Sequence, residues 1–307
     1  MELFRALAVL AEPPDGPEVA RLASLLNLGG PPSASEYTET FVFRFYPYAS
    51  VYLSAEGMLG GEARERIADF LAALGGTPPP EPDHLSTLLA TYARLCAPVG
   101  DDEGADEVED SDGNGGEDND ARRRARLSAA RKAFLWEHVL SWMPFYLARV
   151  AESAPPFYGR WAELLLSALL EEARECGRPR GLPLHLREAP PLADPRAAGA
   201  DEFLSSLLAP ARSGLIITRD ELARAARSLG TSARAGERRF VLKSLLGQDA
   251  RGALRCLSRE ARRQAETHAA RLEQLGEVAE WWTARAFRAA ELLRELSAEA
   301  GEADAVA

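Results

Sequence analysis

The sequence predicts an all-α fold of roughly ten or eleven helices, because its apolar residues recur with the period of an α-helix in most segments. None of these segments shows the sustained alternation of apolar and polar residues that marks a half-buried strand. Two strand-like pieces, at residues 41–45 and 215–217, are too short and isolated to predict a sheet. With 307 residues, 46% of them hydrophobic, the chain can bury a substantial core in one domain or in two or three small ones.

Two helices are predicted in the first hundred residues, at 67–74 and 85–96. In each, apolar residues are spaced three and four apart, which places them on one helix face. Gly75 follows the first helix as the stop typical of a helix C-terminus. A proline-rich turn at residues 77–82 stiffens the connection between them.

Further helices are predicted at residues 134–145 and 158–169, with Pro155-Pro156 as the break between them. Thr218 and Glu221 have the spacing of a capping box, in which each side chain binds a free backbone amide near the other, so a helix begins there. A long helical pattern runs from about residue 250 to the end of the sequence.

Composition divides the chain into four parts. Residues 101–120 carry eleven carboxylates and no base, and we expect an acidic disordered insert because they offer too few apolar side chains to offset the ordering entropy. The insert separates an N-terminal helical half, residues 1–100, from a second helical half, residues 121–208. A cluster of Pro, Gly and Ser then begins a helical C-terminal extension, residues 209–307.

The net charge of −11 is a property of the insert, since the rest of the chain holds 36 acidic and 36 basic residues. The remaining charge is nevertheless uneven. The first hundred residues are acidic, and residues 209–275 have a surplus of seven positive charges.

We expect a cytoplasmic protein that does not insert into a membrane. Residues 1–16 lack the basic and long apolar regions of a signal peptide. No stretch approaches the roughly 18 apolar residues that a membrane-spanning helix needs. Cys96, Cys176 and Cys256 lie far apart in the sequence, which favours reduced thiols over disulfides or a metal site.

The sequence Glu81-Pro82-Asp83-His84 lies directly before the helix predicted at 85–96. Asp83 is well placed as the N-cap of that helix, where its carboxylate would accept from the first free amides. Alternatively, the two carboxylates and the imidazole form a recognition point for a cationic group such as an arginine, which pairs with a carboxylate through two hydrogen bonds.

Aromatic residues gather in two further segments. Tyr48 and Tyr52 lie close to Pro47, and they either line a groove or pack a crossing between helices. Trp136, His138 and Trp142 share the apolar face of the helix at 134–145, where a histidine is most often a satisfied core residue.

The alternative to a core role for His138 is that it binds a metal ion. Together with the carboxylates and His84 of the loop at 81–84, it would supply the ligands of a metal-dependent helical hydrolase. The sequence lacks the HExxH motif, phosphate-binding glycine loops and the GxSxG motif of hydrolases.

Taken in order, several motifs resemble the TorD family of cytoplasmic redox-enzyme maturation chaperones. They are PYASVYLSAEGMLGGEARERIADFLAALG, PPPEPDHLSTLLATYARLC, FLWEHVLSWMPFYLARV and the Tyr158-x-x-Trp161 helix. The EPDH loop followed by an amphipathic helix is the most specific of them. The resemblance covers residues 1–208, and the region after them looks like the extension of longer relatives; the acidic insert departs from the family pattern.

The resemblance implies a TorD-like helical bundle of two halves plus the extension, with no catalytic role and no cofactor of its own. Its partner would be the twin-arginine signal peptide and the apo form of a molybdopterin oxidoreductase, which such chaperones hold until the cofactor is inserted and before export. The family's peptide-binding loop corresponds here to Glu81, Pro82, Asp83 and His84. Tyr48, Tyr52, Trp136, His138 and Trp142 are weaker correspondences, and the resemblance is compatible with a monomer or a homodimer.

A DNA-binding regulator is the main alternative to the chaperone. Residues 218–230 followed by 237–242 have the rhythm of a helix-turn-helix, within the positively charged region 209–275. Against it, the stretch 231–236 is long for the turn of three or four residues in that motif, so we expect no nucleic-acid partner.

Overall fold

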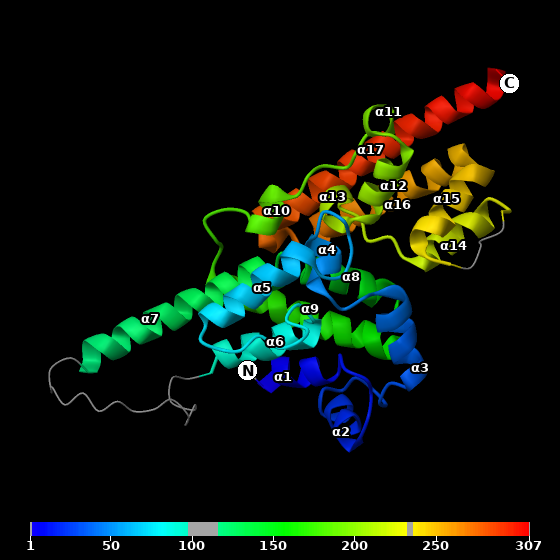
Figure 1. Ribbon diagram of the computed structural model, residues 1–307. Coiled ribbons are helices and arrows are strands. Elements are labelled where there is room, and N and C mark those ends of the chain that lie inside the picture. Colours follow the sequence, from blue (N-terminus) through cyan, green and yellow to red (C-terminus); the bar gives the residue numbers. More distant parts are fainter. Residues whose placement is uncertain (1, 98–115, 232–235, 307) are drawn as a thin grey trace.

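The computed structural model describes residues 2–97, 116–231 and 236–306 (Figure 1). These residues form seventeen α-helices with no strand among them, so the all-α prediction is confirmed. The expected acidic insert lies outside the described residues up to 115, and a helix begins at Gly116, inside the segment predicted as insert.

The N-terminal half is built from short helices. In chain order they are α1 (Glu2–Val9), α2 (Pro17–Leu25), α3 (Ala34–Tyr37), the π-helix η1 (Thr38–Arg44), α4 (Ala49–Leu53), α5 (Gly61–Ala73) and α6 (Leu85–Leu95). The helices predicted at 67–74 and 85–96 are confirmed as parts of α5 and α6. One strand-like piece, residues 41–45, belongs largely to the π-helix η1, in which Phe41 is buried while Val42 and Phe43 are exposed.

The second half contains longer helices that cross the first (Figure 1). They are α7 (Gly116–Phe134), the π-helix η2 (Leu135–Val139), α8 (Met143–Ser153), α9 (Pro156–Cys176) and α10 (Leu184–Glu188). The single helix predicted at 134–145 is interrupted between η2 and α8. Pro144 lies in the first turn of α8, where its missing amide proton costs nothing, and it could not have continued the preceding helix.

The C-terminal extension ends in a hairpin of two long helices that lie side by side (Figure 1). Two short helices, α11 (Pro195–Ala198) and α12 (Ala200–Leu208), precede the extension. The elements of the extension are α13 (Pro210–Ser213), α14 (Arg219–Ser228), α15 (Arg238–Gln248), α16 (Ala250–Arg271), the 3-10 turn η3 (Glu273–Leu275) and α17 (Glu277–Val306). The capping box at Thr218 and Glu221 is confirmed as the start of α14.

The buried apolar residues form one large core and a smaller one. The large core joins both halves, whereas the smaller core lies within the extension and also takes in Phe203, Leu204 and Leu207 of α12. In its packing, α12 therefore goes with the extension. Trp282 of α17 enters the large core, where it stacks on Phe145 with ring centroids 4.8 Å apart and its indole N–H donates to the Ser141 carbonyl at 2.9 Å.

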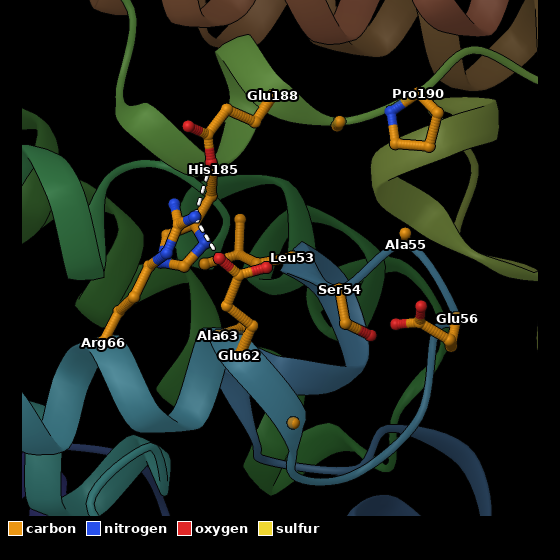
Figure 2. Close-up of a pocket in the computed structure, with 12 residues that line it drawn as sticks. Leu53, Ser54, Ala55, Glu56, Glu62, Ala63, Arg66, His185, Glu188 and Pro190 are labelled. Carbon is orange, nitrogen blue, oxygen red and sulfur yellow. Dashed lines mark hydrogen bonds and ion pairs between the residues drawn. The ribbon is translucent and has the colours of Figure 1, made fainter.

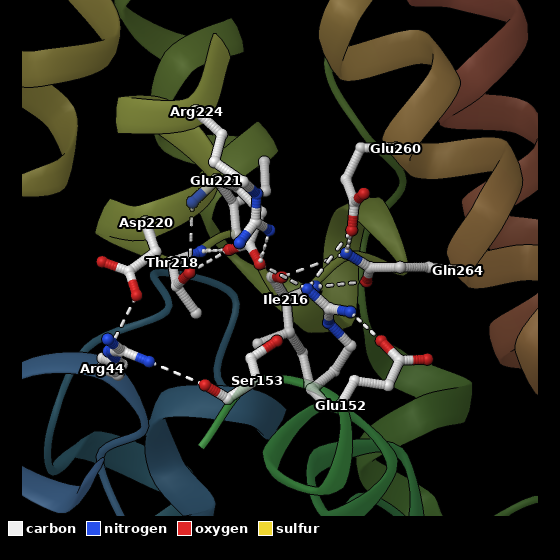
Figure 3. A network of polar contacts seen from close by, with 12 residues as sticks. Arg44, Glu152, Ser153, Ile216, Thr218, Asp220, Glu221, Arg224, Glu260 and Gln264 are labelled. Carbon is white, nitrogen blue, oxygen red and sulfur yellow. Dashed lines mark hydrogen bonds and ion pairs between the residues drawn. The ribbon is translucent and has the colours of Figure 1, made fainter. Parts of the chain in front are cut away.

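A buried network of charges also joins the extension to α8 (Figure 3). Arg149 of α8 is 1% exposed and contacts Glu221 of α14 at 2.5 Å and Glu260 of α16 at 3.2 Å. Arg263 of α16 closes the network through Glu152 at 2.9 Å and Glu260 at 2.7 Å. Since each buried charge has an opposite charge beside it, the network fixes where the extension sits on the body.

None of the helices in the described part of the chain combines the length and the apolar character that a crossing of the membrane requires.

Candidate functional site

The EPDH loop is held against the start of α4 by backbone hydrogen bonds. The amide of Ala49 donates to the Asp83 carbonyl at 2.9 Å, and the amide of Leu85 donates to the Pro47 carbonyl at 2.8 Å. Tyr48 and His84 thus pair as in an isolated antiparallel bridge. Two segments far apart in the sequence, around residues 48 and 83, are therefore brought together at one place.

Asp83 lies beneath the surface of this loop, with only 2% of its area exposed. Its Oδ2 accepts hydrogen bonds from the hydroxyl of Ser50 at 2.6 Å and from the amide of Ser50 at 3.2 Å. The same hydroxyl accepts from the amide of Gly60 at 3.1 Å. Asp83 therefore ties the loop to α4 and, through Ser50, to the connection between α4 and α5.

The interpretation of Asp83 as the N-cap of the following helix is wrong. His84 occupies that position, and its Nδ1 accepts from the amide of Ser86 at 3.3 Å. The carboxylate of Asp83 is instead used at the start of α4, a partner that local sequence spacing cannot reveal.

His84 is 6% exposed and lies next to the end of α1. Its Nδ1 is 2.6 Å from the Ser86 hydroxyl and 3.5 Å from Oε1 of Glu12. The Ser86 hydroxyl in turn donates to Glu12. Burial lowers the pKa of His84 and outweighs the opposing effect of Glu12, Glu81 and Asp83, so the imidazole is neutral at pH 7.

Glu81 is the exposed carboxylate of the loop. It accepts a hydrogen bond from the hydroxyl of Tyr48 at 3.0 Å. Burial and this bond raise the pKa of Tyr48 to about 12. Burial raises the pKa of Tyr37, and the charges of Glu12 and Glu81 raise it further. Both carboxylates therefore lie near Tyr37. We call Glu12, Glu81, Tyr37 and Tyr48 the acidic edge.

Sequence reasoning missed two members of the acidic edge, Glu12 and Tyr37. Glu12 follows α1 directly and reaches His84 only because α1 packs against α6. No spacing pattern links residue 12 to residue 84. The acidity of the first hundred residues was the one available signal, and it did not single out a position.

The other aromatic candidates lie in the protein interior. Tyr52 stacks on Trp142 with ring centroids 5.0 Å apart and planes at 12°, and both are almost fully buried. The indole N–H of Trp142 donates to the His138 carbonyl at 2.9 Å, and that of Trp136 to the Gly177 carbonyl at 3.0 Å. With its surface enclosed and its polar atom bonded, each tryptophan packs the core.

His138 is enclosed by aromatic rings. Phe70 and Phe134 lie 4.9 and 5.5 Å from it between ring centroids, and its Nδ1 has no partner among the described residues. Burial, and then the nearby His185, lower the pKa of His138 to about 3. No group of three potential metal ligands occurs within residues 2–97, 116–231 and 236–306, so the metal site considered for His138 has no counterpart there.

A cavity of about 300 Å³ lies between the α4–α5 connection and α10 (Figure 2). Arg66 of α5 contacts Glu188 of α10 at 2.5 Å and also pairs with Glu62. His185 forms part of the wall, and burial together with the charge of Arg66 lowers its pKa to about 4. Arg66 pairs with Glu62 and Glu188, and Glu56 also lines the cavity, so one of its three carboxylates lies outside the Arg66 pairs.

The family model described as nitrate reductase delta subunit matches residues 17–147. This match covers less than half of the chain, and it supports a redox-enzyme maturation chaperone of the TorD type. The matched segment contains the EPDH loop and every aromatic candidate, and it ends before most of α8 and the extension. The resemblance to TorD-type chaperones is thus confirmed at the level of the family, whose members are chaperones of molybdoenzymes and not enzymes themselves.

Two further comparisons, one with curated proteins and one with solved structures, found no significant match.

Proposed function

We propose that this protein binds the twin-arginine signal peptide, at the N-terminus of a molybdenum-cofactor oxidoreductase, through the acidic edge. Binding would keep the apoenzyme in the cytoplasm until its cofactor is inserted. The observation that carries the proposal is that two exposed carboxylates, Glu81 of the EPDH loop and Glu12, lie near Tyr37 and Tyr48. Guanidinium groups pair strongly with carboxylates and also lie well on aromatic rings, so consecutive arginines would find both kinds of partner.

The buried part of the loop supports this role indirectly. Asp83 and His84 are too enclosed to be the first groups that a peptide meets, at 2% and 6% exposure. Their bonds to Ser50 and Ser86 instead fix the loop in one conformation. A fixed loop loses less entropy on binding, so these residues would act as positioning residues for Glu81.

The apolar stretch that follows the arginines of such a peptide also needs a surface. Met58 and Leu59 are 68% and 59% exposed in the connection between α4 and α5. This connection is fixed at both sides, because Gly60 donates to Ser50 and Gly57 lies so close to Ala209 that a Cβ would be 2.8 Å from its Cα. We therefore place the apolar part of the peptide along Met58 and Leu59.

Isothermal titration calorimetry tests the proposal. The peptides are a twin-arginine signal sequence from a molybdoenzyme of the same genome and its twin-lysine version. We expect the arginine peptide to bind at least about tenfold more tightly, because an ammonium cannot make the two-point contact with a carboxylate. No binding of either peptide, or equal binding of both, would contradict the proposal.

A further inference from the structure

The extension carries a second charged surface, far along the α16–α17 hairpin from the large core (Figure 1). A hollow of about 340 Å³ lies between the two helices. Its lining comprises Arg251, Arg255, Ser258, Arg259, Arg262, Arg294, Ser297 and Ala298. We call it the arginine groove. Five of these residues are cations and none is an acid, which contrasts with the paired charges over most of the protein.

Three of the five guanidiniums form no ion pair within 4.0 Å among the described residues, although the charge of one of them, Arg262, adds to that of Arg294 in lowering the pKa of Glu291. They are those of Arg251, Arg255 and Arg262, all of them exposed. Arg259 donates to the thiol of Cys256 at 3.3 Å, and only Arg294 pairs with an acid, Glu291, at 2.5 Å. The repulsion between these neighbouring cations is therefore not balanced from within the groove.

The positions of the arginines define a line along α16. Residues 251, 255, 259 and 262 are spaced by three or four, which places them on one helix face over about 16 Å of the helix axis. Arg251 lies against α17 at Gly301, where a Cβ would come within 2.8 Å of its Nε. The arginines thus form a row of positive charge along one face of α16.

One observation favours an acidic polypeptide over a single-stranded nucleic acid. The lining contains no aromatic ring on which a base could stack. An extended polypeptide with carboxylate side chains needs no such ring and would pair its charges with those of the arginines.

We propose that the arginine groove binds a polypeptide segment rich in Asp and Glu. This binding would be separate from that of the signal peptide, because the groove and the acidic edge attract opposite charges. Residues 101–120 of the chain itself show how dense such a segment can be, with eleven carboxylates and no base.

The probe is a fluorescently labelled synthetic peptide with the sequence of residues 101–120, titrated with the full-length protein in an anisotropy experiment. We expect binding that weakens steeply as salt rises. Replacing Arg251, Arg255 and Arg262 together by glutamine should weaken it at least about tenfold, because three charge-assisted contacts are lost while glutamine keeps the helix propensity of α16. Circular dichroism checks that the variant remains folded.

The matched control replaces Arg21, Arg187 and Arg227 by glutamine. These arginines are also exposed, and the change removes the same total charge away from the groove. The proposal is overturned if the peptide does not bind, or if the control weakens binding as much as the groove variant does. It is also overturned if a 20-base-pair DNA duplex binds more tightly than the peptide and displaces it, since the groove would then serve nucleic acid.

Discussion

The acidic edge, which includes Glu81 of the EPDH loop, and the aromatic segment from Leu135 to Tyr146 are built in opposite ways. The edge presents exposed carboxylates that rest on buried polar supports, Asp83 and His84. The aromatic segment is buried along most of its length, with its indole N–H groups bonded internally. The family's motifs therefore combine exposed residues with residues of the protein core, and their burial distinguishes the two groups.

Shortening a buried side chain of the aromatic segment should cause the largest loss of stability. Trp142→Ala removes a fully buried ring stacked on Tyr52, so we expect the free energy of unfolding to fall by about 3–5 kcal/mol in urea denaturation. The control is Leu25→Ala at a 76% exposed position, with an expected change below about 0.5 kcal/mol. If both variants lose equally little, Trp142 does not pack the core as described.

Breaking the buried charge network should destabilise the protein nearly as much as Trp142→Ala does. Arg149→Met leaves the carboxylates of Glu221 and Glu260 without one of their cations, and we expect a loss of about 3–5 kcal/mol in the free energy of unfolding. Arg174→Met, which breaks an exposed pair with Glu171, should cost below about 1 kcal/mol. If the two variants lose similar amounts of stability, the contact between α8 and the extension is not buried.

The stability of the protein should fall with pH because of His138, the buried histidine of the aromatic segment. The pKa of His138 is about 3 in the folded protein, below its ordinary value of 6.5, so the unfolded chain takes up a proton first as the pH falls. Its contribution to stability is complete above pH 6.5 and is lost progressively toward pH 3. Between pH 6.5 and 5 the loss is about 2 kcal/mol.

The matched variant for this effect is His138→Leu, measured by urea denaturation at pH 7 and pH 5. It should lose less stability between the two pH values than the unchanged protein does, because one proton-binding site of the unfolded chain has been removed. An identical pH dependence in both proteins would mean that His138 is accessible to solvent.

Two further variants compare the acidic edge with the buried residue that supports it. Asp83→Asn weakens the buried bonds to Ser50 and should lower the free energy of unfolding by about 1–3 kcal/mol. Glu81→Gln changes an exposed residue and should leave it within about 0.5 kcal/mol. Thermal and urea denaturation measure both variants. A larger loss of stability for Glu81→Gln than for Asp83→Asn would show that Glu81, and not Asp83, supports the loop.

Sequence patterns predicted the parts of the fold that depend on local periodicity and capping. The helices around residues 67–74 and 85–96 and the capping box at Thr218 are of this kind, since their signals lie within a few residues. The break between η2 and α8 was missed although Pro144 marks it, because the apolar face continues across it. The packing of α12 with the extension depends on contacts with distant helices, which periodicity does not encode.

For the candidate site, the sequence identified the loop at residues 81–84 but not which of its side chains are exposed. The resemblance singled out Glu81, Asp83 and His84 together, and only their burial distinguishes the exposed carboxylate from the two supports. Glu12 could not be found, because it reaches the loop through the packing of α1 on α6.

The central claim is that Glu12 and Glu81 together meet the arginines of the signal peptide. Calorimetry with the twin-arginine peptide on the Glu12→Gln/Glu81→Gln variant tests it most directly, with Glu18→Gln/Glu65→Gln as a control that removes the same charge from other exposed positions. We predict an affinity at least about tenfold lower for the first variant and an unchanged affinity for the control. Unchanged affinity in the first variant, with the protein still folded, would contradict the claim.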